Sequence, residues 1–301
     1  MSQNRSVLVV ITGPTAVGKS SLALELARTL HTEIISADSR QIYRTLNIGT
    51  AKPSPHELSE INHHFINHLD LDEKYTAVQY ARECLSLLKA KFEQHQSLIM
   101  VGGTGLYLKA VLEGFDDIPD VPTELQEDWN EKLASGGLEV LQRALDKVDP
   151  AYAKVVDRDN ARRLIRALAV HQFTGRPYSS FLTGARKPLP YRVLSICLVQ
   201  ERAKLYERIN TRVDDMINEG LMAEAESLLA HRDLQALQTV GYKELFPYFD
   251  GDYDLDEAIR LIKRNTRRYA KRQMTWFRKY GEWDFMEADR TSSEDILGLH
   301  A

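Results

Sequence analysis

The chain has 301 residues, enough for two domains or for one large domain with an insertion. Hydrophobic residues make up 43% and charged residues 27%, which excludes a chain that is disordered throughout, and 16 glycines and 10 prolines without a period exclude collagen-like and low-complexity classes. The net charge of −4 excludes a globally basic nucleic-acid binder but leaves a local basic patch open.

The cysteine count and the hydropathy pattern indicate the cellular compartment. Cys84 and Cys197 are too few for a disulfide framework or a cysteine-rich zinc site, and we expect both to be small buried side chains in a reducing compartment. The apolar run at residues 7–11 is too short for a secretory signal, and no stretch approaches the roughly 20 apolar residues of a membrane helix. We expect a soluble, cytosolic monomer without a membrane partner.

The first part of the chain alternates between predicted strands and helices. Apolar runs at residues 7–12, 32–37 and 97–101 predict buried strands, whereas residues 21–30, 75–91 and those from 106 onward have helical character. Residues 13–20 form a loop between the first strand and the first helix. This alternation predicts an α/β fold with a parallel sheet flanked by helices.

The pattern changes at residues 118–122, which read IPDVP, and again at 187–190, which read KPLP. The chain between these points is mostly helical, residues 193–199 predict a further strand, and the chain from 205 onward is helical. We therefore predict a core domain of residues 1–118 and 189–301, interrupted by a helical insertion of residues 119–188.

The loop after the first strand matches the phosphate-binding pattern G-x-x-x-x-G-K-[ST]. Its glycines allow backbone N–H groups to face an anion, and the following helix N-terminus adds a favourable dipole. Lys19 would neutralise a terminal phosphate and Ser20 would offer a hydroxyl ligand to Mg²⁺. The pattern indicates a diphosphate or triphosphate ligand without specifying a nucleotide. The predicted diphosphate-binding residues are Gly13, Pro14, Thr15, Ala16, Val17, Gly18, Lys19 and Ser20.

Polar residues follow the next two predicted strands. Asp38 closes the second strand and Thr104, within Gly102–Gly105, closes the third. Because carboxyl ends of neighbouring parallel strands face one crevice, both should lie near the phosphate loop. Asp38 could bind Mg²⁺, accept a proton or only cap a helix, and the glycine turn could be purely structural. The glycines stand where many phosphate-loop ATPases carry an acidic residue, which argues against an ATPase.

Basic residues gather in three segments. Residues 260–279 contain no acidic residue and interleave cations with Tyr269, Trp276 and Phe277, a pattern that suits a nucleic-acid backbone or, alternatively, a solvated helix with an aromatic core face. Two further clusters are centred on Arg162 and Arg208 and suit phosphate oxygens. His63, His64 and His68 lack the supporting ligands of a zinc site, and we expect them to form local hydrogen bonds.

Together these motifs resemble one family, the bacterial tRNA dimethylallyltransferases. The segments that carry the resemblance span residues 13–278 and read GPTAVGKS (13–20), DSRQIY (38–43), IGTAKP (48–53), HHF (63–65), GGTGLY (102–107), DRDNARRLIRAL (157–168), VGYKE (240–244) and KRQMTWFR (271–278). The resemblance implies a phosphate-loop fold, Mg²⁺, and transfer of a dimethylallyl group from dimethylallyl diphosphate to N6 of the adenosine 3′-adjacent to the anticodon in tRNAs that read codons beginning with U.

The resemblance also implies roles for individual residues. Asp38 would be the base near N6, Thr104 would lie at the reacting centre, and Arg208 or Arg212 would neutralise the departing diphosphate. The anticodon stem-loop of the tRNA would be bound at residues 38–41, 162–166, 238–243 and 271–278, within which the predicted contacts are Asp38, Ser39, Arg40, Gln41, Arg162, Arg163, Leu164, Ile165, Arg166, Gly241, Tyr242, Lys243, Lys271, Arg272, Gln273, Trp276 and Arg278.

The chain departs from the family pattern in one place, where Ala169 replaces the glutamate that many members carry after the RAL triplet. Two cysteines cannot form the zinc finger of eukaryotic members, which favours a bacterial member. Three alternatives stay open: an adenylate isopentenyltransferase, a small-molecule kinase with a phosphate loop, and a non-enzymatic RNA-binding protein. The basic segments argue against the first two, and the intact phosphate loop argues against the third.

Overall fold

The structure is a computed structural model that describes residues 6–184 and 188–300. Within these residues the chain forms two compact units: the residues up to Glu113 together with those from Pro188 onward, and Gly114–Lys187 between them. The insertion therefore begins five residues before the predicted position 119, and Lys187 of the KPLP segment lies outside the described residues. No described helix combines the length and apolar character needed to cross a bilayer.

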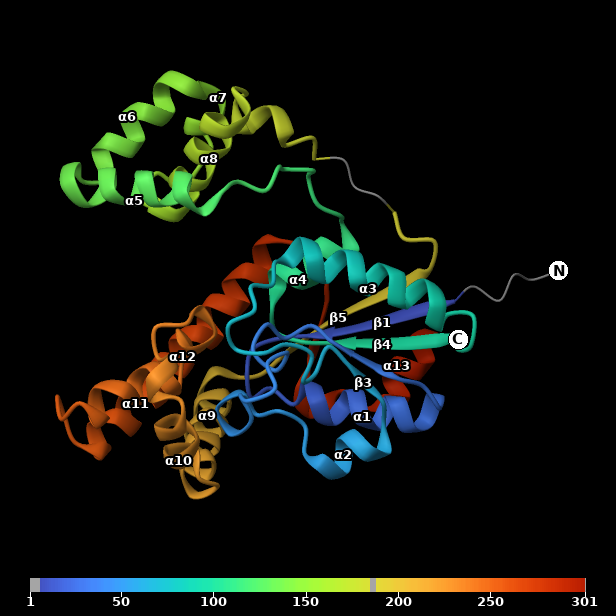
Figure 1. Ribbon diagram of the computed structural model, residues 1–301. Coiled ribbons are helices and arrows are strands. Elements are labelled where there is room, and N and C mark those ends of the chain that lie inside the picture. Colours follow the sequence, from blue (N-terminus) through green and yellow to red (C-terminus); the bar gives the residue numbers. More distant parts are fainter. Residues whose placement is uncertain (1–5, 185–187, 301) are drawn as a thin grey trace. The chain divides into compact units, whose positions relative to one another are not determined.

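The larger unit is built on a parallel sheet whose strand order is β3-β2-β4-β1-β5-β6 in the described residues (Figure 1). The strands are β1 (Val7–Thr12), β2 (Ile34–Ser36), β3 (His63–His64), β4 (Ser97–Val101), β5 (Arg192–Val199) and β6 (Asp284–Glu287). β1 is buried along its whole length because it pairs with β4 and β5 and both faces are covered. The predicted α/β fold class is confirmed.

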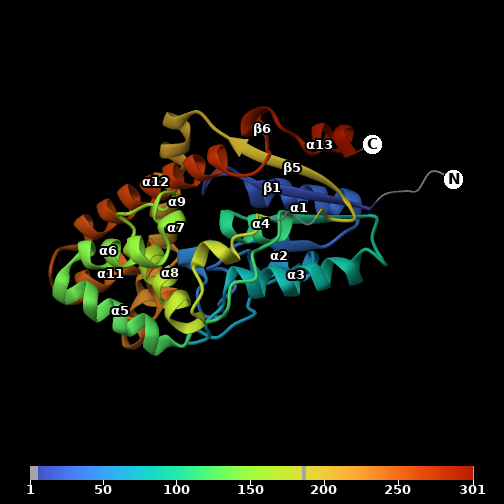
Figure 2. The same cartoon turned by 90° about the horizontal axis from the view of Figure 1, so that it is seen from above.

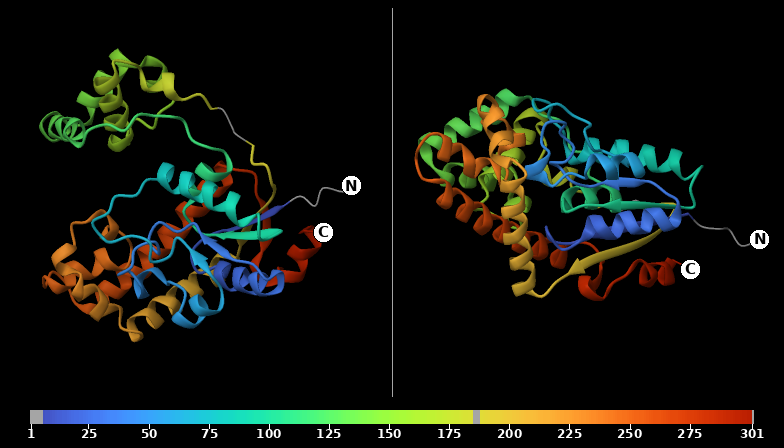
Figure 3. Two further views of the ribbon diagram at one scale, coloured as in Figure 1. Left: turned by 45° about the vertical axis from the view of Figure 1, so that its right-hand side comes forward. Right: turned by 90° about the horizontal axis from the view of Figure 1, so that it is seen from below.

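Helices cover both faces of this sheet. α1 (Lys19–Leu30) and α13 (Ser293–His300) lie on one face, and α3 (Ala77–Lys91) and α4 (Gly105–Leu112) lie on the other (Figures 1 and 3). The apolar side of α1 packs on β1 through Ala23 and Leu26. Cys84 of α3 and Cys197 of β5 are both buried, as expected. The short elements η1 (Ile48–Thr50) and α2 (Pro55–Glu60) lie between β2 and β3.

The C-terminal helices group together beyond one end of the strands (Figure 2). They are α9 (Arg202–Asn218), α10 (Leu221–Ser227), η3 (Leu229–His231), η4 (Gln235–Leu237), α11 (Tyr242–Phe249) and α12 (Leu255–Lys279). Asp254 caps the N-terminus of α12, because its side chain accepts a hydrogen bond from the Glu257 backbone N–H. Its buried face consists of Ala258, Ile262, Ala270, Gln273 and Phe277.

The prediction that the chain from 205 onward is entirely helical was wrong, because β6 and the following η5 (Ala288–Arg290) interrupt it. β6 is an edge strand whose residues are mostly exposed, so its sequence lacks the apolar run that identifies a buried strand. β3 was missed for a similar reason, because a strand of two half-buried histidines carries no periodicity.

The smaller unit contains α5 (Thr123–Gly136), α6 (Leu138–Val148), α7 (Pro150–Ala153), α8 (Ala161–Thr174) and η2 (Tyr178–Phe181). Its core forms around Leu141 and Leu145 of α6 and Leu164 and Leu168 of α8, all buried. Asn160 accepts a hydrogen bond from the backbone N–H of Arg163 and thereby fixes the start of α8. The predicted helical character of the insertion is confirmed.

Candidate active site

The phosphate loop connects β1 to α1 and folds around the side chain of Lys19. Gly18 has a φ of 108°, a conformation that glycine adopts without strain. Lys19 Nζ donates hydrogen bonds to the carbonyl oxygens of Gly13, at 3.1 Å, and Pro14, at 2.8 Å. Burial, and then the neighbouring Arg212 guanidinium, lower the pKa of Lys19 to about 8. The half-buried Lys19 ammonium and the start of α1 are suited to a strongly charged anion.

A cavity of about 570 Å³ adjoins the loop. Lys19, the exposed Ser20 and two arginines of α9, Arg208 and Arg212, line it. Its volume falls within the range of small-molecule sites, and its cations complement a diphosphate. The structure therefore brings together the predicted phosphate loop and both candidate arginines.

Asp38 lies just beyond the carboxyl end of β2. Its Oδ1 atom accepts hydrogen bonds from the backbone N–H groups of Arg40, at 2.8 Å, and Gln41, at 3.2 Å. Thr104, beyond the end of β4, accepts a hydrogen bond at Oγ1 from the backbone N–H of Ser39, at 3.0 Å. The predicted proximity of the two strand ends is confirmed. Asp38 is half-buried, and one of its oxygens already has partners, which fixes the direction of the carboxylate.

Asp38 lines a second cavity, of about 310 Å³, which Thr15 and the C-terminal helices complete. Arg212 lines both cavities, whereas Arg208 is found only in the first. The walls contributed by the C-terminal part of the chain include residues 238–241, Lys243, Tyr269 and Arg272. The arrangement therefore places a carboxylate in one cavity and a phosphate loop in the other, with the Arg212 guanidinium shared between them.

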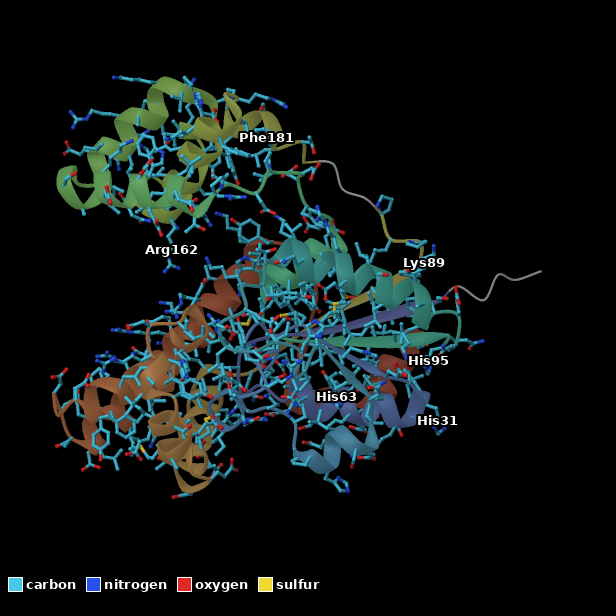
Figure 4. All side chains as sticks on the ribbon, in the orientation of Figure 1. His31, His63, Lys89, His95, Arg162 and Phe181 are labelled. Atoms are coloured by element: carbon cyan, nitrogen blue, oxygen red, sulfur yellow. The ribbon has the colours of Figure 1, made fainter. Side chains whose placement is uncertain are left out.

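The predicted tRNA contacts in the smaller unit divide by exposure. Arg162 and Arg163 are exposed, and Figure 4 shows Arg162 projecting from the helical unit. Arg166 is half-buried and donates to the carbonyl oxygen of Pro119 at 3.1 Å. Leu164 and Ile165 are buried in the unit's core. The prediction that these two side chains contact tRNA needs correction, because the helix turns them inward.

The contacts predicted in the larger unit divide in the same way. Lys243, Lys271, Arg272 and Arg278 are exposed. Trp276 is half-buried, and its ring lies so close to Gly105 that a side chain there would collide with it. Tyr242 and Gln273 are buried, so we withdraw both as side-chain contacts to tRNA. Eight of the predicted contacts are exposed or half-buried cations: Arg40, Arg162, Arg163, Arg166, Lys243, Lys271, Arg272 and Arg278.

Two residues that shape the site were missed in the sequence. Glu224 of α10 accepts hydrogen bonds from the backbone N–H groups of Ile48, at 2.9 Å, and Gly49, at 3.1 Å, and from the Tyr242 hydroxyl, at 2.6 Å. Lys52 Nζ donates to the Tyr43 carbonyl at 2.7 Å and to Asn67 Oδ1 at 2.6 Å, and burial lowers its pKa to about 8. Lys52 belongs to the IGTAKP segment, but Glu224 carries no motif signal.

The three histidines form local hydrogen bonds, as expected. His63 Nδ1 lies 2.7 Å from the Ile61 carbonyl oxygen, His64 Nε2 lies 2.6 Å from Glu33, and His68 Nε2 lies 3.2 Å from Glu83. Figure 4 labels His63 in the larger unit. Among residues 6–184 and 188–300, no group of three or more His, Cys, Asp or Glu side chains could hold a metal ion.

Comparison with known proteins supplies a family for this arrangement. The family model described as IPP transferase matches residues 41–280. A tRNA dimethylallyltransferase 1 from Bacteroides fragilis is 47% identical over 90% of this chain and 90% of its own. A tRNA dimethylallyltransferase from Christiangramia forsetii is also 47% identical, over 95% of this chain and 94% of its own.

Solved structures agree with these relatives. A tRNA isopentenylpyrophosphate transferase from Bacillus halodurans superposes with a TM-score of 0.70 at 38% identity, over 98% of this chain and 95% of that one. A eukaryotic dimethylallyltransferase acting on tRNA superposes with a TM-score of 0.84 at 28% identity, over 98% of this chain and 78% of that one. The phosphate loop, the carboxylate beyond β2 and the extent of these matches lead to one conclusion: the chain belongs to the IPP transferase family.

Proposed function

We propose that this protein transfers a dimethylallyl group from dimethylallyl diphosphate to N6 of the adenosine 3′-adjacent to the anticodon in tRNAs that read codons beginning with U. One observation carries the proposal: Arg212 lines both the cavity beside the phosphate loop and the cavity that contains Asp38. A donor diphosphate at Lys19 and an acceptor base at Asp38 would then meet at this arginine.

The chemistry follows from the groups at the two cavities. The adenine N6 atom is a weak nucleophile because its lone pair is delocalised into the ring. N6 forms a bond to C1 of the dimethylallyl group while the C1–O bond breaks, and the electron pair of that bond leaves with diphosphate. Asp38 accepts the proton lost from N6. Lys19 and Arg212 stabilise the negative charge that develops on the departing diphosphate.

Mg²⁺ fits the donor set at the phosphate loop. Ser20 offers one exposed hydroxyl at the 570 Å³ cavity, and a hard cation with few protein ligands keeps water and substrate phosphate oxygens in its other positions. When bound, the ion would supply further charge to the diphosphate oxygens. Ser20 would hold it, while Lys19 remains the protein's own cation at that site.

Acceptor recognition rests on exposed and half-buried cations around the Asp38 cavity. Arg40, Lys243 and Arg272 line this cavity, and Lys271 is exposed next to Arg272 on α12. Such cations bind phosphates of an anticodon stem-loop, while the base leaves the loop stack and enters the cavity, at a cost of a few kcal/mol that is least in a single-stranded loop. Arg162 and Arg163 add exposed cations on the smaller unit.

The test is transfer of labelled dimethylallyl diphosphate to unmodified tRNA that carries adenosine next to the anticodon, with AMP and ATP in parallel reactions. We expect label on tRNA alone, and no label on a tRNA with guanosine at that position. Label on AMP but not on tRNA would instead identify an adenylate isopentenyltransferase. Consumption of ATP without label on either acceptor would identify a kinase.

A further inference from the structure

Gln273 of α12 joins two of the loops at the active site. Its side chain is 7% exposed. The Oε1 atom accepts a hydrogen bond from the backbone N–H of Thr15 in the phosphate loop, at 2.9 Å, and the Nε2 atom donates to the carbonyl oxygen of Gly103, at 3.0 Å. One amide therefore connects the loop after β1 to the turn after β4.

The packing around this amide explains two glycines of the GGTG turn. A Cβ atom at Gly103 would collide with Gln273 Nε2, and a Cβ atom at Gly105 would collide with the Trp276 ring. α12 therefore approaches the turn more closely than a side chain at Gly103 or Gly105 would allow. Because Gln273 and Trp276 lie three residues apart on one helix, they contact the turn from the same side.

The two loops held by Gln273 contact the residues proposed to act in the reaction, Arg212 and the segment that begins at Asp38. Thr15 also accepts a hydrogen bond at Oγ1 from Arg212, at 3.3 Å. Thr104, next to Gly103, accepts the Ser39 backbone N–H, and Ser39 follows Asp38 directly. Gln273 therefore bonds the diphosphate side directly at Thr15, whereas it reaches the acceptor side only indirectly, through the turn that contains Thr104.

We infer that Gln273 is a positioning residue that holds the phosphate loop at Thr15 in register with the GGTG turn, and that it acts on donor binding rather than on tRNA binding. This inference rests on the proposed function. It assigns different tasks to neighbours on one helix: the exposed Lys271 and Arg272 face the acceptor, whereas the buried Gln273 orders the donor loop. Its amide is suited to this task because it accepts at one end and donates at the other.

Two substitutions of Gln273 test whether it orders the donor loop. Gln273→Met keeps the length of the side chain but removes both hydrogen bonds. Gln273→Glu keeps the acceptor for Thr15 but, when ionised, cannot donate to Gly103. Asn265→Ala is the matched control, because Asn265 is a half-buried amide on the same helix that bonds Glu244, at 2.8 Å, and neither loop. Each variant is first checked for folding by its thermal transition.

The measurements are the calorimetric affinity for inorganic diphosphate, and KM and kcat for each substrate. We expect Gln273→Met to weaken diphosphate binding about tenfold and to raise KM for dimethylallyl diphosphate, with KM for tRNA unchanged, whereas Asn265→Ala leaves diphosphate affinity at the wild-type value. Gln273→Glu should bind diphosphate progressively closer to the wild type as pH falls, because a protonated carboxyl again donates to Gly103.

Two results would overturn the inference: a folded Gln273→Met that binds diphosphate as the wild type does, or one whose defect lies only in KM for tRNA. A Gln273→Glu variant whose diphosphate affinity relative to the wild type does not change with pH would also contradict it. If the wild-type protein transfers no dimethylallyl group to tRNA, the proposed function fails, but the diphosphate titrations still decide the role of Gln273.

Discussion

Arg212 Nη1 donates a hydrogen bond to Thr15 Oγ1 at 3.3 Å, which ties α9 to the phosphate loop. Burial is the largest influence on Arg212 and lowers its pKa, although the neighbouring Asp38 carboxylate opposes this shift. Arg208 is exposed one turn earlier on the same helix. A desolvated guanidinium exerts a stronger field on a developing charge than a hydrated one. The two arginines that the sequence left as alternatives are therefore not equivalent.

We expect Arg212→Ala to lower kcat by about 10²-fold or more, because it removes the cation that both cavities share. Arg208→Ala is the matched control from the same helix and should mainly raise KM for dimethylallyl diphosphate. Steady-state kinetics with each substrate varied in turn distinguish the two. Equal losses of kcat in both variants would contradict the assignment.

Asp38 is tested best by Asp38→Asn, which keeps an oxygen for the Arg40 and Gln41 backbone N–H groups but cannot accept a proton from N6. We expect kcat to fall by about 10²- to 10⁴-fold, with tRNA affinity unchanged. Asp38→Ala also loses the hydrogen bonds to the Arg40 and Gln41 backbone, so its kcat should fall at least as far. Near-wild-type turnover by Asp38→Asn would exclude Asp38 as the base.

Substitution of the exposed cations of α12 should affect tRNA binding alone. Lys271→Glu and Arg272→Glu should each weaken tRNA binding and reduce the dependence of the binding constant on salt, because fewer counterions are released. Arg260→Glu is the control, since Arg260 lies at the other end of α12 and is already paired with Glu257. Filter binding at salt concentrations between about 50 mM and 200 mM measures both the tRNA affinity and its dependence on salt. Unchanged affinity and slope would leave α12 as a solvated structural helix.

The smaller unit contains none of the residues that line the cavity beside the phosphate loop. Replacement of Gly114–Lys187 by a glycine-serine linker should therefore preserve calorimetric binding of diphosphate and weaken binding of tRNA. The double variant Arg162→Ala with Arg163→Ala should weaken tRNA binding in the same direction without removing the unit. Loss of diphosphate affinity in a folded deletion variant would contradict this division of tasks.

The lowered pKa of Glu33 should make the free energy of unfolding depend on pH. Burial would raise its pKa, but hydrogen bonds from His64 and Lys91 hold the pKa at about 2, below the ordinary 4.5. Because the folded-state pKa is the lower one, its contribution of about 3 kcal/mol is complete above pH 4.5 and is lost as pH falls toward 2. Glu33→Gln should lack this contribution.

Urea unfolding between pH 7 and pH 3 measures the difference. The free energies of unfolding of the wild type and Glu33→Gln should differ most at pH 7 and converge as pH falls. The exposed Glu93, on the turn that follows α3, provides the control Glu93→Gln. Two curves that stay parallel over this range would show that Glu33 does not carry the effect.

Much of the site was readable from the sequence because its signals are local. The phosphate loop is one continuous pattern between a strand and a helix, and Asp38 and Thr104 each follow a strand, so the general rule for parallel sheets predicts their proximity. The strongly apolar strands and the change of pattern at the insertion were readable for the same reason. The continuous motifs also carried the resemblance to the family.

The tertiary structure decided which face of each helix the motif residues occupy and what they contact. Gln273 lies between exposed cations in the sequence, yet it is buried and bonds Thr15, which is 258 positions away. Leu164 and Ile165 follow two exposed arginines but form the core of their unit. Arg212 lines both cavities whereas Arg208 lines only the first, a difference that residue spacing does not show. Residue spacing describes local geometry, whereas burial and long-range hydrogen bonds arise only when distant segments pack together.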